Sequence, residues 1–170
     1  MEYQIRPIKS GENALLSDFL YEAIFQRDGD KRIPKSILKQ AEMKVYIEDF
    51  GKEDDCCLVA VVNDKPIGAV WTRILCGKVK GFGNIDGKTP EFAISLYKEY
   101  RGKGIGTQLM FEMLSVMKEK GYRQTALADQ KDNYAVKMYQ KVGFTIVDEK
   151  EEEYIMVCKY NFLCLNVYSL

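Results

Sequence analysis

The stretch from Pro90 to Met117 constrains this chain most, because it joins a short apolar strand to a helix through a basic, glycine-rich turn. The strand is predicted at 91–97, the turn reads Arg101-Gly102-Lys103-Gly104-Ile105-Gly106, and apolar residues at helical spacing follow to about 120. A helix that begins at such a turn offers unpaired backbone N–H groups and the positive end of its dipole to an anion. Glycine lets the backbone approach a ligand closely. The pattern therefore predicts a site for a phosphate or pyrophosphate.

The spacing of the glycines excludes two common phosphate-binding loops. The chain contains no Gly-x-x-x-x-Gly-Lys-Ser/Thr run, so a P-loop is excluded. The dinucleotide fingerprint Gly-x-Gly-x-x-Gly fails in both registers, because Thr107 and Leu109 stand where the third glycine is needed. What remains is Arg-x-x-Gly-x-Gly between a strand and a helix. Taken alone, this turn is equally compatible with a plain helix cap.

Composition indicates an ordinary globular protein. The 170 residues, with 46% hydrophobic and 29% charged residues, favour one domain over residues 1–170. The formal net charge is zero, so no overall field would hold nucleic acid, and nucleic acid is not expected as a partner. Residues 1–10 lack a signal-peptide pattern, and no apolar run reaches membrane-spanning length. We therefore expect a cytoplasmic protein without a membrane partner.

The chain contains no histidine, which removes several catalytic classes. Ser-His-Asp and Cys-His catalysis, histidine-based zinc sites and an imidazole general base are all excluded. The five cysteines form no C-x-x-C pair and are odd in number, so neither a disulfide framework nor a zinc ribbon is indicated. No metal is expected. An enzyme with this composition must use carboxylates, tyrosine, water or a cofactor.

Strands and helices alternate along the sequence, which predicts a mixed α/β sheet with helices on both faces. Periodicity and turn residues place strands at 3–8, 57–62, 67–75, 91–97, 124–128, 144–147 and 154–160, and helices at 12–25, 35–49, 106–120 and 132–141. The apolar tail 161–170 is too short to span a membrane; a docked segment or a dimer contact is the expectation for it.

A second motif lies downstream, where residues 133–144 read Asn-x-Ala-x-x-x-Tyr-x-x-x-Gly-Phe. Ala135 and Tyr139 are four residues apart and share one helix face. A small residue beside a phenol leaves open space on that face, and Gly143 is suited to end the helix. The two motifs together, in this order, resemble those of the GNAT superfamily of N-acetyltransferases. The resemblance covers nearly the whole chain and is strongest over 90–160.

The resemblance implies a fold and a donor substrate. The fold is a single mixed, mostly antiparallel sheet of about six to seven strands, splayed between the fourth and fifth strands, with helices on both faces. Acetyl-CoA is the implied cosubstrate, with its pantetheine arm in the splay and its pyrophosphate on the glycine-rich turn. The positions carried over for the cofactor are Ile94, Ser95, Leu96, Arg101, Gly102, Lys103, Gly104, Ile105, Gly106, Thr107 and Asn133.

The implied reaction is direct attack of a primary amine on the thioester, in a ternary complex. The resemblance assigns proton donation to the CoA sulfur to Tyr139. With no histidine available, Glu91 is the candidate base; it is alternatively a solvated strand-end carboxylate or an electrostatic contact for the amine. The acceptor is expected to be a small-molecule amine or a peptide N-terminus. Candidate acceptor-lining residues are Tyr21, Phe25, Trp71, Arg73 and Phe82.

Two other readings stay open at the level of sequence. One is a non-catalytic GNAT-fold module that binds acyl-CoA as a sensor or interaction partner, since the motif residues would serve binding as well as turnover. The other is a nucleotide-phosphate enzyme of a different fold. The oligomeric state is expected to be a monomer or a homodimer.

Overall fold

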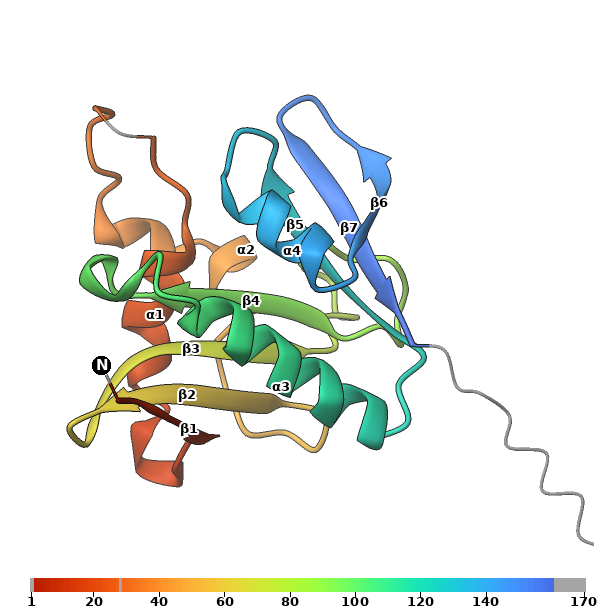
Figure 1. Cartoon of the computed structure of the whole chain (residues 1–170). Helices are drawn as coiled ribbons and strands as arrows, with labels where there is room; N and C mark the ends of the chain where they lie inside the picture. The colour runs from red at the N-terminus through yellow and green to blue at the C-terminus, as the bar shows by residue number, and fades with distance from the viewer. Residues whose placement is uncertain (1, 28, 161–170) are drawn as a thin grey trace, which may run out of the picture.

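The computed structural model describes residues 2–27 and 29–160, which form one sheet in the strand order β1-β2-β3-β4-β5-β7-β6 (Figure 1). Every neighbouring pair is antiparallel except β4 and β5, which are parallel. The mixed, mostly antiparallel sheet expected from the resemblance is thus confirmed. The strands are β1 (Gln4–Pro7), β2 (Cys56–Val62), β3 (Lys65–Arg73), β4 (Glu91–Leu96), β5 (Gln124–Gln130), β6 (Thr145–Glu149) and β7 (Glu153–Lys159).

Helices cover both faces of the sheet, with α3 and α4 in front of it and α1 behind it in Figure 1. Each face buries its own apolar core, one against α3 and α4 and the other against α1 and α2. The helices are α1 (Leu15–Ala23), α2 (Ala41–Lys44), α3 (Ile105–Glu119) and α4 (Ala135–Lys141), with short 3₁₀ turns η1 (Ser10–Glu12), η2 (Lys35–Lys39) and η3 (Lys98–Tyr100).

Strand β4 lies between these two cores. Successive side chains of a strand point to opposite faces. Phe92 and Leu96 accordingly lie in the core beneath α3 and α4, whereas Ala93 packs against the core beneath α1 and α2. The Ser95 hydroxyl donates to the Phe19 carbonyl of α1, at 2.7 Å. Burial on both faces explains why the sequence of this strand is almost continuously apolar.

The sheet divides between β4 and β5. Six consecutive residues of β4 pair with β3. In contrast, β4 pairs with β5 only at Glu91 and Ala126. The Ala126 N–H donates to the Pro90 carbonyl at 2.9 Å, at the start of both strands. Beyond this point the two strands diverge, so their facing backbone groups do not complete a ladder. The splay expected between the fourth and fifth strands lies here.

The predicted helix 35–49 is wrong as a single element. Gln40 is extended, with ψ 143°, and separates η2 from the four-residue α2. After α2 the backbone turns its carbonyls toward Arg73, whose Nη1 donates to the Val45 and Glu48 carbonyls at 2.9 and 2.7 Å. Those carbonyls serve a buried guanidinium, and the chain continues in turns rather than in a longer helix. The predicted helix 12–25 likewise divides, into η1 and α1.

Within the described residues, no helix combines the length and the apolar character that crossing a membrane requires. The tail 161–170 lies outside the described residues, so the expectation of a docked segment or a dimer contact stays a prediction.

Candidate active site

The glycine-rich turn leads directly into the N-terminus of α3. Gly102 and Gly104 have φ of +72° and +81°, a conformation that side-chain-bearing residues rarely adopt. Apart from the adjacent residues, no heavy atom of the described residues lies within 4 Å of the place where a Cβ would stand on either glycine. The first backbone bond of the helix runs from the Gln108 N–H to the Gly104 carbonyl, so the N–H groups before it are left to other acceptors. The turn therefore has the form of an anion cradle, which fits a pyrophosphate.

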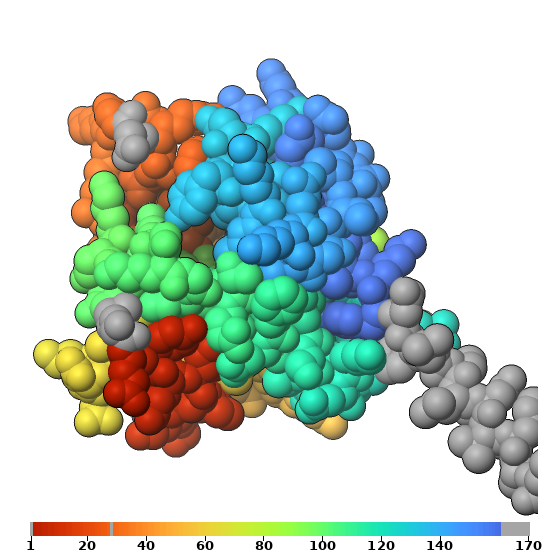
Figure 2. All heavy atoms as spheres, viewed as in Figure 1, coloured from red at the N-terminus to blue at the C-terminus, as the bar shows by residue number. Residues whose placement is uncertain are grey.

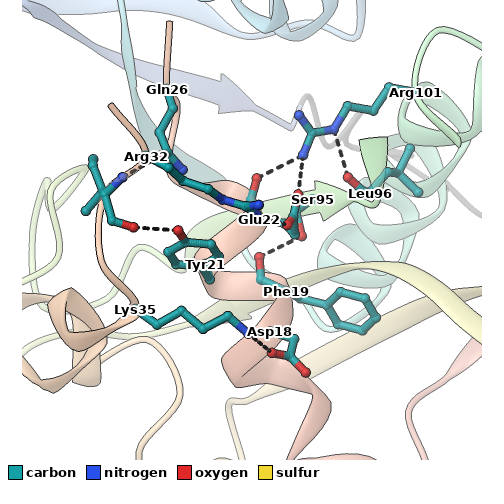
Figure 3. A network of polar contacts seen from close by, with 11 residues as sticks. Asp18, Phe19, Tyr21, Glu22, Gln26, Arg32, Lys35, Ser95, Leu96 and Arg101 are labelled. Atoms are coloured by element: carbon teal, nitrogen blue, oxygen red, sulfur yellow. Dashed lines mark hydrogen bonds and ion pairs between the residues drawn. The ribbon is translucent and has the colours of Figure 1, made fainter. Parts of the chain in front are cut away.

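The two cations of the turn are engaged with the protein. Arg101 donates from Nε to the Leu96 carbonyl at 2.8 Å and from Nη2 to the Glu22 carboxylate at 2.9 Å (Figure 3). Lys103 Nζ donates to the Glu99 carbonyl at 2.8 Å. Arg101 thus ties the turn to α1, and the backbone N–H groups rather than these side chains face an incoming anion.

The strand residues predicted for the pantetheine arm lie on β4, beside the splay. Ile94, Ser95 and Leu96 pair with β3 through Val70, Ala69 and Gly68. A Cβ on Gly68 would stand 2.5 Å from the Ser95 carbonyl oxygen, so only glycine allows β3 this close to β4. With β3 on one side and the divergence from β5 on the other, the backbone of these residues is placed to pair with an extended ligand.

Asn133 lies in the turn between β5 and α4, where it caps the helix. Its Oδ1 accepts from the Ala135 N–H at 3.0 Å, and its Nδ2 donates to Asp129 Oδ1 at 2.9 Å. The side chain is therefore held on both sides by the protein. This contact makes Asp129, at the end of β5, part of the candidate site.

Tyr139 lies on α4 with its ring packed at 61° to Phe144, the centroids being 6.1 Å apart. The side chain is 8% exposed, and burial together with the nearby Asp129 charge raises the pKa of its phenol above the usual value. Within the described residues, no hydrogen bond is assigned to its hydroxyl group, and burial keeps that group protonated. The arrangement suits a proton donor at neutral pH.

Glu91 begins β4 on the face covered by α1 and α2, and its side chain is 3% exposed. Its Oε1 accepts from the Tyr46 hydroxyl, and from the Gly83 N–H at 2.8 Å. Burial raises the pKa of its carboxyl group above the usual value, while the Tyr46 and Gly83 hydrogen bonds oppose that shift. A Cβ on Gly81 would stand 2.0 Å from Oε2, so the loop closes over the carboxylate.

The comparisons with known proteins agree with this geometry. The model of the Acetyltransferase (GNAT) family matches residues 21–144. The chain belongs to the GNAT acetyltransferase family. It is an acetyltransferase, and acetyl-CoA is its acetyl donor.

Similarity to individual proteins indicates the same family. The chain is 32% identical over 126 residues to N-alpha-acetyltransferase 30 of Schizosaccharomyces pombe, covering 73% of this chain and 80% of that protein. It is also 32% identical over 83 residues to mycothiol acetyltransferase of Corynebacterium aurimucosum, covering 48% of this chain and only 25% of that protein. The fold resembles the PaiA N-acetyltransferase of Thermoplasma acidophilum in complex with coenzyme A. For that structure the TM-score is 0.69 and the identity 22%, over 94% of this chain and all of that one.

Two of the residues predicted to line the acceptor site are buried among structural partners in this GNAT protein. Trp71 is fully buried and donates from Nε1 to the Tyr46 carbonyl at 3.1 Å. Arg73 forms an ion pair with Asp55 at 2.9 Å, and its Nη1 donates to two carbonyls beyond α2. An acceptor group that paired with Arg73 would have to displace Asp55, a buried partner.

The other three predicted lining residues each have different contact partners. Tyr21 is buried, and its hydroxyl donates to the Ile33 carbonyl (Figure 3). Phe25 is half-buried, with the Arg27 guanidinium 5.9 Å from its ring centroid. Phe82 is 40% exposed; its ring stacks on Tyr46, and its N–H donates to the Tyr46 hydroxyl at 2.7 Å. Phe82, like Trp71, therefore shares its partner Tyr46 with Glu91.

A pocket of about 560 Å³ opens between α1, η2 and the end of β4, lined by Asp18, Tyr21, Glu22, Arg32, Lys35 and Tyr97. Figure 2 shows the molecular surface hollowed between the orange N-terminal segment, the green segment that follows β4 and the light blue segment that leads into α4. In the described ranges, no group of three His, Cys, Asp or Glu side chains is placed to hold a metal ion.

Sequence reasoning missed two residues of the site. Tyr46 contacts Glu91 from 45 positions away and carries no local signal. Asp129 did have a signal: it follows an apolar strand run and stands four residues before Asn133, at the end of β5. Polar residues that close an apolar strand next to a binding motif are placed to reach the same ligand.

Proposed function

We propose that this enzyme transfers the acetyl group of acetyl-CoA to a primary amine by direct attack in a ternary complex. The observation that carries the proposal is the conjunction of two features. Strands β4 and β5 diverge beyond Glu91 and Ala126, and the same β4 leads into a glycine-rich turn at the start of α3. The gap between the diverging strands can hold the extended thioester arm. The glycine-rich turn can bind the pyrophosphate.

The α-amino group of a peptide is the acceptor that one of the two relatives favours. One relative that this chain resembles over most of both lengths is an N-alpha-acetyltransferase. A small-molecule amine is the other acceptor class within the proposal. The five lining residues proposed from sequence stay part of the proposed acceptor site. Trp71 and Arg73 contribute to that site by holding the segment that contains Val45 and Tyr46, and not by direct contact with the acceptor.

In the proposed complex, the N–H groups of Gly102 to Thr107 bind the pyrophosphate, and Asn133 contacts the pantetheine arm. Backbone N–H groups beside the splay polarise the thioester carbonyl and stabilise the negative charge that develops on its oxygen. Holding both reactants in place supplies the largest share of the rate, since orientation is worth about 7–11 kcal/mol in well-aligned reactions.

Proton transfer accompanies the attack. A free alkyl amine has a pKa of about 10.4 and a peptide α-amine about 7.7–8.0, so the amine must lose a proton to the protein or to water. Tyr139 is proposed to donate to the departing sulfur. Glu91, proposed from sequence as the base, is covered by the loop at Gly81 and Gly83, so this role requires that loop to withdraw.

The test is a thiol-release assay with acetyl-CoA and a panel of free-amine peptides, their N-terminally blocked counterparts, and small amines such as spermidine. We expect release of CoA thiol that depends on a free α-amine. Thermal stabilisation by acetyl-CoA without thiol release across the whole panel would contradict the enzymatic proposal and support a non-catalytic acyl-CoA-binding module. The cytoplasmic location and the monomeric or dimeric state stay predictions.

A further inference from the structure

Three buried side-chain oxygens lack a hydrogen-bond partner within the described residues, and all three lie on the two strands that diverge. They are Glu91 Oε2 on β4, and Asp129 Oδ2 and Gln130 Oε1 on β5. An oxygen that is buried without a partner costs free energy, so natural proteins keep such atoms mainly where a ligand or water completes them. As acceptors, these oxygens require donor groups, which is what an amine presents.

Asp129 lies on β5 opposite the stretch of β4 that is proposed to pair with the thioester arm. The parallel strands are paired at Glu91 and Ala126, and three residues further along each strand are Ile94 and Asp129. Ile94 is one of the residues whose backbone is proposed to pair with the pantetheine. Asp129 therefore flanks the same stretch of the splay from the opposite strand.

The carboxylate of Asp129 is oriented by the protein. Its Oδ1 accepts from Asn133 Nδ2 at 2.9 Å and from the Gln130 N–H at 2.9 Å. Asn133 is itself fixed by the Ala135 N–H. These contacts use one oxygen and leave Oδ2 for a ligand, an arrangement that preorganises a reacting group.

The groups that face Asp129 prepare it to exchange a proton near neutral pH. Burial, together with the charges of Glu153 on β7 and Asp132 in the following turn, raises the pKa of its carboxyl group to about 6. The hydrogen bonds from Asn133 and the Gln130 N–H oppose this shift. Tyr139 on α4 has its own pKa raised, partly by the Asp129 charge. A carboxylate poised near the operating pH beside a phenol kept protonated is a base and acid pair.

We propose that Asp129, rather than Glu91, is the general base of the acetyl transfer. This inference rests on the proposed function and deepens it. The amine nitrogen forms a bond to the thioester carbon as its proton passes to Asp129 Oδ2. The carbon–sulfur bond breaks, and Tyr139 gives its hydroxyl proton to the departing sulfur. Protonated Asp129 then returns a proton to the Tyr139 phenolate, directly or through water, and both groups regain their starting states.

The geometry favours Asp129 over Glu91 on access. Glu91 is 3% exposed, its Oε1 is occupied by Tyr46 and Gly83, and Gly81 lies against its Oε2. Asp129 Oδ2 is buried as well, but the residue as a whole is half-buried, and both of its hydrogen bonds are made by Oδ1. Glu91 in this account holds the loop through Gly83 and Tyr46.

The experiment measures the pH dependence of kcat, at saturating acetyl-CoA and amine, for the wild type and for Asp129→Asn, Asp129→Glu and Glu91→Gln. The exposed Asp148→Asn is the matched control. The wild type should gain activity as pH rises through about 6, because the base must be deprotonated. Asp129→Asn should lose about 100-fold or more in kcat and show no rise through this range, with CoA affinity, measured by calorimetry, within about threefold of wild type. Asp129→Glu should keep the rise at reduced kcat.

Glu91→Gln and Asp148→Asn should keep the wild-type pH profile. If the wild type is active and Asp129→Asn retains both the wild-type kcat and its increase with pH, the assignment of Asp129 is overturned while the proposed function stands. If Glu91→Gln loses the increase of kcat with pH, the role of base returns to Glu91. A wild type that releases no thiol with any amine would overturn the proposed function as well. Circular dichroism melting of each variant establishes that it is folded.

Discussion

At the scale of single residues, Tyr139 combines packing with a chemical group that the fold does not use. Its ring packs against Phe144 in the core beneath α4, while no partner within the described residues is assigned to its hydroxyl. Packing alone would be served equally well by phenylalanine. A buried phenol beside the splay therefore favours a role for the hydroxyl in the reaction.

Tyr139→Phe separates the two roles of this side chain. Removing the hydroxyl should lower kcat about 100-fold, the usual contribution of a general acid, because the thiolate would leave without a proton. The affinity for CoA, measured by calorimetry, should stay close to wild type because the ring still packs on Phe144. Wild-type turnover in the thiol-release assay would reduce Tyr139 to a packing residue.

Residue roles could be predicted from sequence only where the motif itself carries them. The positions of Asn133 and Tyr139 follow from the spacing of the second motif. Arg73 was predicted to line the acceptor site, but nothing in the local sequence shows that Asp55 and the carbonyls beyond α2 occupy its donors. Such partners lie 18 to 28 residues away, and only the fold brings them together.

At the scale of elements, the turn and helix that bind the anion form one unit. The positive φ of Gly102 and Gly104 allows the chain to enter α3 with its first N–H groups directed away from the helix. Arg101 fixes this unit to α1 through Glu22. The anion site is therefore built from backbone groups whose position depends on glycine.

Gly104→Asp should weaken CoA binding about 100-fold, because the new carboxylate would stand within a few ångströms of the pyrophosphate, where like charges repel by about 1–4 kcal/mol each. Gly104→Asn is the matched control. Asparagine has the same size without the charge, and both residues tolerate the left-handed conformation better than most. Calorimetric titration of CoA should therefore show a loss below about tenfold for asparagine. Equal affinities for the wild type and the aspartate variant would place the pyrophosphate elsewhere.

Elements with strong periodicity were predicted well, and those shaped by tertiary contacts were not. The helix expected at 106–120 is α3 to within a residue at each end, because its apolar positions repeat over four turns. The helix expected at 35–49 is wrong, since Gln40 breaks it and the following carbonyls serve Arg73. Short helices depend on their surroundings more than on their own propensity.

At the scale of the whole molecule, the two halves of the sheet are joined where Glu91 of β4 pairs with Ala126 of β5. Beyond this pairing β4 and β5 diverge. Strands β1 to β4 form one half, and β5, β7 and β6 form the other (Figure 1). The resemblance predicted this splay, whereas strand periodicity could not, because each strand taken alone reads as ordinary buried β-structure. The three buried oxygens that have no hydrogen-bond partner among the described residues lie on the two diverging strands, which connects the fold directly with the chemistry.

The most direct test of this account is a crystal structure of the protein with CoA bound. It should show pyrophosphate oxygens within hydrogen-bond distance of the N–H groups of residues 102–107, and the pantetheine arm between β4 and β5, with its sulfur beside Tyr139 and Asp129. CoA bound outside the splay, or a pyrophosphate that does not touch the turn, would contradict the account.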